Sequence, residues 1–177
     1  MGHCDIQIPN DYVSYWKFNN NFNDEAGNNP GSGIGVSFVS GKEGQGIDLN
    51  GYDNYVTVPD SSSFDLANAF TLSAWVNPDV IIGLDRCVIC KDNNNDNYAY
   101  AFGLIRDGRI FSEFSVDGFA STWPSYALVS GETVAEDQWV YITTTYNGMD
   151  LMIYLNGTLV ESSIIGPRNI FNSAANL

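Results

Sequence analysis

Short apolar stretches that alternate with polar residues follow one another along the chain, and each ends at Gly, Asn, Asp or Pro. The clearest stretch, FTLSAWV, places Phe70, Leu72, Ala74 and Val76 on one face of a strand, and Thr71, Ser73 and Trp75 on the other. Further strands are expected in YVSYWKF, CVICK, YAYAFGLI, RIFSEFSV, QWVYITTTY, DLMIYLN and TLVES. No stretch has a 3.6-residue apolar period of useful length. About ten evenly spaced strands without helices between them are typical of an all-β, antiparallel sandwich or jelly roll.

Turn chemistry predicts how some of these strands connect. The apolar pieces GIDL and YVTV flank NGYDN (residues 50–54), which predicts a tight hairpin. LNGT (residues 155–158) predicts a turn between the last two strands, and DSSSFDL (residues 60–66) could form a single helical turn.

Length and charge narrow the function classes. With 177 residues the chain is most simply one domain. Its formal charge of −14 comes from 21 acidic and only 7 basic residues, which argues against nucleic-acid binding and against an anionic membrane surface. No apolar run is long enough to cross a bilayer, so we expect no membrane insertion. A neutral ligand or a cation fits this charge.

The three cysteines leave the disulfide pattern open. Cys87 and Cys90 lie in an expected strand, where three residues span about 10 Å, beyond disulfide reach. We therefore expect no bridge between them, whereas Cys4 could pair with either. A zinc site that also uses His3 is disfavoured because adjacent ligands are poorly spaced.

The order of several blocks resembles a known family. The blocks are YWKFNNNFNDEAGNN, GKEGQGIDLNGYDNYVTVP, FDLANAFTLSAWVNP, CVICKDNNNDNYAYAFGLIRDGRI and QWVYITTTYNGMDLMIYLNGTLV, and they cover most of residues 12–160. Together they resemble the laminin G-like jelly rolls of the concanavalin A-like lectin/glucanase superfamily. The resemblance implies a two-sheet β-sandwich over residues 10–177, after a tail of residues 1–9 that cloning could have added. Such domains usually continue into further strands, so we expect a piece of a longer protein that lacks its final strand or strands.

Catalysis is not expected. Retaining glycoside hydrolysis needs two carboxylates about 5 Å apart on one face, and the superfamily's glucanases are expected to carry them on one strand. Here Asp24-Glu25 and Glu136-Asp137 are adjacent pairs at loops, and Glu113 is the single acid in its strand. The sequence predicts that this domain is not an enzyme.

Calcium is the cofactor that the loops suggest. Calcium takes oxygen ligands from carboxylates, amides and carbonyls in flexible loops, and the resemblance implies a structural calcium near the N-terminal loop. The candidate ligands are Asp24, Asn29, Asn50 and Asp53. The alternative is that these are ordinary turn residues.

Sugar binding needs aromatic rings beside hydrogen-bonding side chains, because pyranoses have apolar faces edged with hydroxyls. The candidate ligand-binding residues are Phe119, Trp123 and Tyr126 in a loop-rich segment, and Asn97, Tyr98 and Tyr100, with both tyrosines on one face of their strand. The alternative is a set of aromatic residues that cap the edge of the sandwich.

The combined prediction is a non-catalytic, lectin-like carbohydrate-binding module of a larger extracellular or cell-surface protein. It would bind a polysaccharide or oligosaccharide, by default a neutral one, and adjoin other domains of that protein. The alternative is an adhesin or structural module that binds protein and no sugar.

Overall fold

The protein is described by a computed structural model, in which residues 12–81, 83–93, 97–119 and 126–177 are described. These residues contain twelve strands and one 3₁₀ turn. The chain divides into two compact units, Met1–Phe64 and Asp65–Leu177.

The first unit contains two antiparallel strand pairs and the 3₁₀ turn. β1 pairs with β4 and β2 pairs with β3, so the predicted hairpin across residues 50–54 is wrong. The elements are β1 (Ser32–Ile34), β2 (Ser37–Ser40), β3 (Gln45–Asp48), β4 (Tyr55–Thr57) and η1 (Ser62–Phe64). The strand expected over residues 12–18 is reduced to one isolated bridge between Trp16 and Asp24. The expected helical turn is confirmed as η1.

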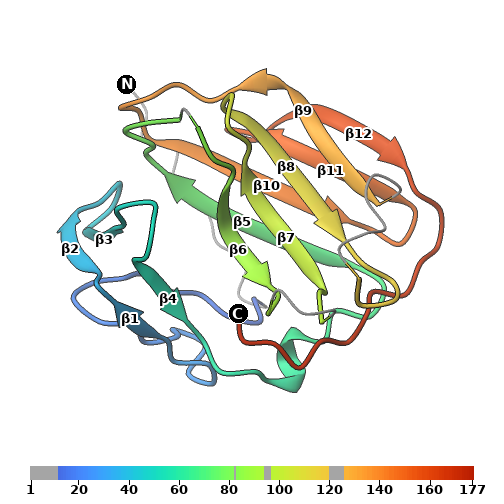
Figure 1. The fold of residues 1–177 in the computed structure, drawn as a ribbon, viewed down its shortest axis with the longest axis horizontal. Coiled ribbons are helices and arrows are strands. Elements are labelled where there is room, and N and C mark those ends of the chain that lie inside the picture. Colours follow the sequence, from blue (N-terminus) through green and yellow to red (C-terminus); the bar gives the residue numbers. More distant parts are fainter. Residues whose placement is uncertain (1–11, 82, 94–96, 120–125) are drawn as a thin grey trace. The chain divides into compact units, whose positions relative to one another are not determined.

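The second unit is a sandwich of two four-stranded antiparallel sheets (Figure 1). One sheet has the order β12-β11-β10-β5 and the other β6-β7-β8-β9. The strands are β5 (Phe70–Val76), β6 (Arg86–Lys91), β7 (Tyr100–Leu104), β8 (Arg109–Phe114), β9 (Ala127–Thr133), β10 (Val140–Tyr146), β11 (Asp150–Leu155) and β12 (Thr158–Ile164). The predicted all-β, antiparallel two-sheet sandwich is confirmed.

Strict alternation of apolar and polar residues builds the core between these sheets. Every second residue of β10 is buried, from Val140 to Tyr146. In β5, Phe70 is buried in the core and Leu72 and Val76 pack against it, as the sequence predicts. Burial of such side chains stabilises the fold by about 25 cal/mol per Å² of apolar surface.

One polar pair crosses this apolar core. The Thr144 hydroxyl of β10 donates to the Ser112 hydroxyl of β8 at 2.7 Å, and both residues are fully buried. Buried hydroxyls must be hydrogen-bonded to avoid a desolvation cost. This contact therefore satisfies both hydroxyls and links β10 to β8 across the core.

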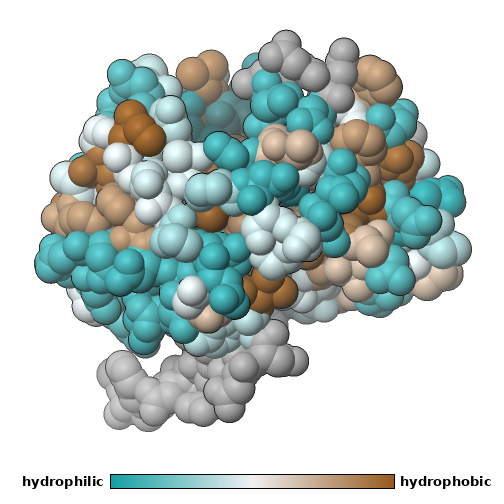
Figure 2. Space-filling model, turned by 90° about the horizontal axis from the view of Figure 1, so that it is seen from below, coloured by the Kyte–Doolittle hydropathy of each residue, from teal (hydrophilic) through white to brown (hydrophobic). Residues whose placement is uncertain are grey.

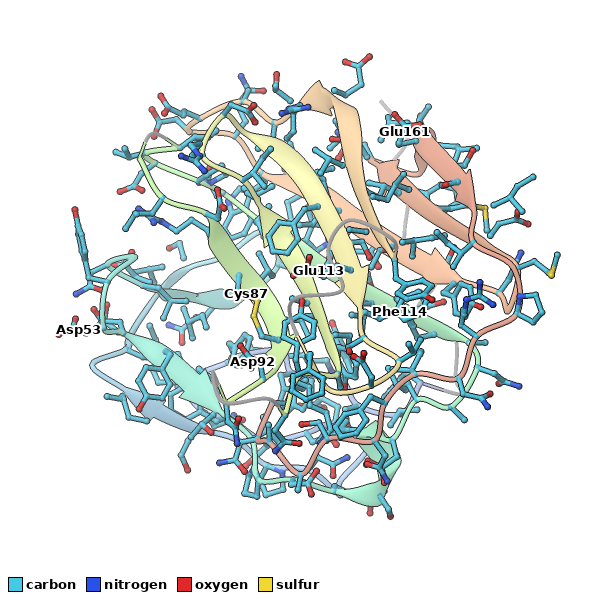
Figure 3. The ribbon with its side chains drawn as sticks, turned by 45° about the vertical axis from the view of Figure 1, so that its right-hand side comes forward. Asp53, Cys87, Asp92, Glu113, Phe114 and Glu161 are labelled. Carbon is cyan, nitrogen blue, oxygen red and sulfur yellow. A yellow bond between two sulfur atoms is a disulfide. The ribbon has the colours of Figure 1, made fainter. Side chains whose placement is uncertain are left out.

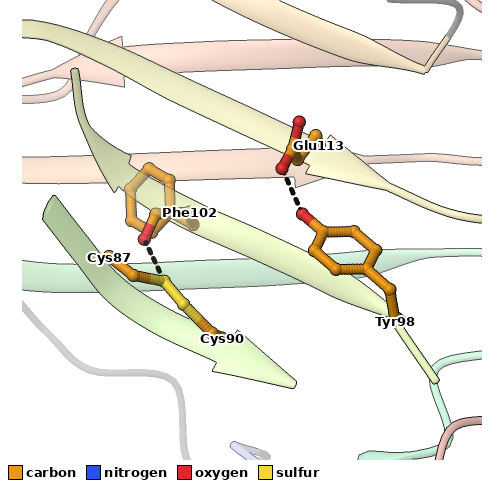
Figure 4. The surroundings of a disulfide bond; sticks show 5 residues. All are labelled: Cys87, Cys90, Tyr98, Phe102 and Glu113. Carbon is orange, nitrogen blue, oxygen red and sulfur yellow. Dashed lines mark hydrogen bonds between the residues drawn. A yellow bond between two sulfur atoms is a disulfide. The ribbon is translucent and has the colours of Figure 1, made fainter. Parts of the chain in front are cut away.

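A disulfide joins Cys87 and Cys90 within β6 (Figures 3 and 4). The expectation that they do not pair is wrong, because β6 is not regular. The pairing of β6 with β7 shifts register between Cys87 and Ile89, and this β-bulge bends the strand. The two Cα atoms are therefore 6.2 Å apart, within disulfide reach.

The segment of residues 165–175 runs along one end of the sandwich (Figure 1). Its backbone N–H groups donate to three carbonyls: Ile165 to Met149, Ile170 to Ala67 and Phe171 to Ser115. Near its end the Ser173 hydroxyl donates to the Asn97 carbonyl at 2.6 Å. The fully buried amine of Lys91 donates to the Ala175 carbonyl at 2.9 Å. The segment is thus bonded to β6 and to loops at the ends of strands from both sheets.

Hydrophilic residues cover much of the face shown in Figure 2, with apolar residues scattered among them. Over the described residues, no helix is long and apolar enough to span a membrane.

Candidate functional site

Three loops meet at the end of the sandwich where β5, β7 and β11 begin and β8 and β10 end. They surround an open depression with a volume of ≈ 310 Å³, which is at the lower end of the range for small-molecule sites. Its lining residues are Asn68, Gly148, Pro167, Arg168 and Asn169. At Gly148 φ is +91°, a conformation that favours glycine, and a Cβ there would meet the Asn68 carbonyl at 3.4 Å.

Arg168 is held in place from both its backbone and its side chain. Its N–H donates to the Tyr146 hydroxyl at 2.8 Å, and that hydroxyl donates to the Gly166 carbonyl at 2.7 Å. The guanidinium lies 5.5 Å from the ring centroid of Tyr126, in a cation–π contact. Tyr126 in turn stacks on buried Phe114, with centroids 5.6 Å apart and an angle of 22° between the rings. The arginine is therefore oriented by an aromatic stack that reaches the core.

The polar side chains that line this depression have hydrogen-bond donors without partners among the described residues. Within the described ranges, Arg168 makes no ion pair; its Nη1 donates only to the neighbouring Pro167 carbonyl. Over the same residues, the side-chain amides of Asn68 and Asn169 make no hydrogen bond, and Arg168 and Asn169 are exposed. These three side chains are thus free to donate hydrogen bonds to a ligand.

The expected aromatic loop lies at the same end. Phe119 is 43% exposed, and its loop is fixed by the Ser115 hydroxyl, which donates to Asp117 and accepts from the Gly118 N–H. A Cβ on Gly118 would meet the ring of Phe171 at 2.8 Å, so the loop packs closely on the C-terminal segment. Trp123 lies outside the described residues.

Tyr98 and Glu113 lie on the outer face of the sheet β6-β7-β8-β9 (Figure 4). The buried Tyr98 hydroxyl donates to a Glu113 carboxylate oxygen. Burial raises the pKa of Glu113, and the charges of Asp92 and Asp85 raise it further against the lowering effect of the Tyr98 hydrogen bond. Burial and the Glu113 charge likewise raise the pKa of Tyr98. The ring of Tyr98 packs on Phe111, so it offers a ligand little surface.

The two tyrosines do not share a face, contrary to expectation. Tyr100 is 1% exposed and stacks on Phe70 in the main core, whereas Tyr98 belongs to the outer cluster. The reason is that β7 begins only at Tyr100 and the preceding backbone is irregular. Asn97 has a structural partner: its side-chain oxygen accepts the Ala174 N–H.

Asp24 and Asn29 form a hydrogen-bonded centre in the first unit. One carboxylate oxygen of Asp24 accepts the N–H groups of Tyr15 and Ala26, and the other accepts the Asn29 N–H and the Ser14 hydroxyl. Burial alone would raise the pKa of Asp24, but these four donors outweigh it and hold the pKa below its usual value. Both oxygens therefore already accept hydrogen bonds, which a bound calcium ion would have to replace.

Asn50 and Asp53 form a separate turn. The Asn50 side-chain oxygen accepts the N–H groups of Tyr52, Asp53 and Asn54, and its amide donates to Asp53 at 2.7 Å. Its oxygen thus already accepts three N–H groups, which a cation would have to replace. Over the described residues there is no group of three or more His, Cys, Asp or Glu that could hold a metal ion.

The residues that line the depression were not among the sequence candidates. Asn68, Gly148 and Arg168 are far apart in the chain, and only the fold brings their loops together. The one available signal was the turn-like stretch GPRN at residues 166–169, which follows the last apolar strand.

Comparison with known proteins places the fold in a family. Residues 50–177 match the family described as "Concanavalin A-like lectin/glucanases superfamily". No curated protein matches the sequence.

Solved structures share the fold at low identity. The binding domain of Paraclostridial Mosquitocidal Protein 1 superposes with a TM-score of 0.67 at 24% identity, over 87% of this chain and 40% of that one. This chain therefore spans less than half of that binding domain. Domain 4 of AbnA, an extracellular arabinanase from Geobacillus stearothermophilus in complex with arabinotriose, gives 0.64 at 19% identity, over 89% of this chain and 77% of that one. An S-layer domain-containing protein from Clostridium thermocellum gives 0.53 at 23% identity, over 86% and 73% of the respective chains.

Proposed function

Because the chain belongs to the concanavalin A-like lectin/glucanases superfamily, we propose that it is a non-catalytic carbohydrate-binding module. The observation that carries the proposal is the depression in which the amides of Asn68 and Asn169 lie beside an arginine stacked on Tyr126. Sugars are recognised by such combinations of hydrogen-bond donors and aromatic rings.

The aromatic residues nearby extend this surface. The half-buried ring of Tyr126 contacts the Arg168 guanidinium, and Phe119 is 43% exposed. Trp123 stays a sequence prediction as a stacking residue between them in the chain. The structurally similar arabinanase domain was solved with arabinotriose, which supports a glycan as the ligand class.

A non-catalytic binding role also agrees with the hydrogen-bond partners of Glu113 and Asp24. Glu113 is engaged with Tyr98, and Asp24 with four donors, so neither is poised as one of two cooperating carboxylates. We further propose an extracellular or cell-surface location within a larger protein, a setting in which sugar-binding modules hold an enzyme or a cell near a polysaccharide. Calcium stays a prediction of the sequence alone, and we expect it to bind weakly because its candidate ligands would have to exchange hydrogen bonds for the ion.

The second candidate function is an adhesin or structural module that binds protein. Exposed apolar side chains favour it, notably Ile34 and Tyr55, which are direct cross-strand neighbours on β1 and β4 and 41% and 52% exposed. Such a patch suits a protein partner better than a hydroxyl-rich glycan.

Affinity electrophoresis against soluble polysaccharides, with pull-down on insoluble ones, tests the proposal. The variants are Asn169→Ala and Trp123→Ala, with Arg106→Gln at the opposite end of the sandwich as the matched surface control. Retention by a glycan that the first two variants weaken about tenfold and the control does not would support it. If no glycan retains the folded protein, the adhesin function replaces it.

A further inference from the structure

The depression contains an exposed arginine without an ionic partner, in a chain whose formal charge is −14. Of the other three described arginines, Arg106 lies 3.8 Å from Asp85 and Arg109 lies 2.9 Å from Asp107, whereas Arg86, which is partly buried, makes no ion pair with a described residue either. With 21 acidic residues available, the absence of a described carboxylate near the Arg168 guanidinium is notable. It leaves a fixed positive charge in a largely negative surface.

The guanidinium is also pre-organised. The Tyr126 ring restricts one face of it, the Pro167 carbonyl accepts from Nη1, and the backbone N–H is fixed by Tyr146. Arginine presents parallel N–H groups that match the two oxygens of a carboxylate. An arginine whose rotamer is already restricted loses less conformational entropy on binding.

Resting on the proposed function, we propose that this depression binds a sugar that carries a carboxylate, of the uronic or sialic acid class, rather than a neutral sugar. Arg168 pairs with the carboxylate, and the amides of Asn68 and Asn169 bond the neighbouring hydroxyls.

The ligand is a single acidic sugar unit within or at the end of a glycan, not a dense polyanion. The net charge repels a chain that carries a carboxylate on every residue. A lone carboxylate is governed by the charge within a few ångströms, because salt screens interactions beyond about 8–10 Å. One arginine is therefore enough to select it.

The test compares pairs of probes that differ only in the carboxylate. Calorimetry or fluorescence titration is run with 3′-sialyllactose against its carboxyl methyl ester, and with an aldobiouronic acid, a glucuronosyl disaccharide, against its methyl ester. We expect the acidic member of at least one pair to bind about tenfold or more tightly than its neutral partner. The variant Arg168→Gln should remove this preference, because a charged hydrogen bond of this kind is worth about tenfold to hundredfold in affinity.

Two further variants separate charge from geometry. Arg168→Lys keeps the charge but not the planar fork, so we expect a partial loss. Arg106→Gln removes the same charge at the turn between β7 and β8, at the other end of the sheet, and should leave binding unchanged. Unchanged melting temperatures establish that each variant is folded.

The outcomes distinguish the two proposals. Equal binding of neutral and acidic partners at the depression would overturn the acidic-sugar inference and leave the carbohydrate-binding proposal standing. Acidic binding that Arg168→Gln does not weaken would also overturn the inference. If neither the neutral nor the acidic probes nor any glycan of the wider panel binds, both proposals fail.

Discussion

The hydroxyl of Tyr98 donates a hydrogen bond to the carboxylate of Glu113, and both side chains lie against the outer face of the sheet β6-β7-β8-β9. Glu113 and Phe114 are successive residues of β8 (Figure 3). Because side chains alternate along a strand, Glu113 points outward and Phe114 points into the core. A partly buried acid beside a neutral phenol is a small pH-sensitive element within the sandwich.

The pKa of Glu113 is raised above its usual value of 4.5, chiefly by burial. A raised acid pKa means that the folded state holds the proton longer than the unfolded state, so stability falls as the pH rises from about the unfolded value through the folded one. Glu113→Gln keeps an acceptor for Tyr98 and cannot ionise. We expect its melting temperature, relative to wild type, to increase between pH 4 and pH 8 by about 1–4 °C.

Thermal unfolding from pH 4 to pH 8 measures the difference in melting temperature between Glu113→Gln and wild type. The exposed Glu132 serves as control, since Glu132→Gln removes the same charge without the burial. If the difference in melting temperature between Glu113→Gln and wild type did not change with pH, the raised pKa of Glu113 would be contradicted.

For Asp24, in the first unit, we expect stability to depend on pH in the opposite direction. Its lowered pKa, the net result of burial and four hydrogen bonds, gives stability that is present above the unfolded value near 3.8 and is lost as the pH falls through the folded pKa. Asp24→Asn turns an amide toward groups that already donate. We expect a loss of about 2–3 kcal/mol in the free energy of unfolding, measured by urea denaturation.

Glu25→Gln is the matched control for Asp24. The exposed Glu25 pairs with Lys17 at 3.3 Å, and surface pairs contribute less than about 1 kcal/mol. Equal losses in the two variants would show that the Asp24 centre carries no special stability.

We expect calcium addition to change the melting temperature of the protein only slightly. The oxygens of Asp24 and Asn50 already accept N–H donors, and an ion would have to replace these bonds. We expect the melting temperature to differ by less than about 1 °C between millimolar calcium and excess chelator, since a ligand stabilises only in proportion to its binding. A rise of several degrees would restore the calcium site that the sequence predicts.

The disulfide between Cys87 and Cys90 is tested chemically. Alkylation of the unfolded, unreduced protein should label Cys4 alone, and labelling after reduction should reach all three cysteines. Cys90→Ser should lower the free energy of unfolding by about 2 kcal/mol, the value expected for a very short closed loop. Labelling of Cys87 without reductant would refute the bridge.

Lys91→Met removes the buried donor to the Ala175 carbonyl. We expect faster amide hydrogen exchange over residues 170–175, because the segment loses an anchor near its end, and a loss of about 1–3 kcal/mol in stability. Lys17→Met, at an exposed position, is the control. Unchanged exchange in the segment would show that its other bonds suffice.

Local patterns were enough to predict the sandwich. The alternation in Phe70–Val76 gave the correct inward face, and the Asn156-Gly157 turn joins β11 to β12, with φ of 51° and 80° at its two residues. These features depend on neighbouring residues only. The same rules therefore apply before any tertiary contact is known.

Where the backbone is irregular, the same local patterns led to wrong predictions. A bulge between Cys87 and Ile89 shortened the distance between the two cysteines that an ideal strand would keep, and the irregular backbone before Tyr100 put Tyr98 on the other face of the sheet. The depression was beyond prediction for another reason. Its arginine and amides come from loops whose proximity depends on the pairing of whole strands.

The path of residues 165–175 has a mechanical consequence. Tension applied from the carboxyl side of Leu177 would reach the Ala175 contact first, then Ser173 and Phe171, before it reached Arg168 and Asn169. Bonds that break one after another would dissipate load while the residues that line the depression stay in register. The segment would therefore lose its anchors in order from Ala175 inward, and the loop that carries Arg168 and Asn169 would be the last part of it to move.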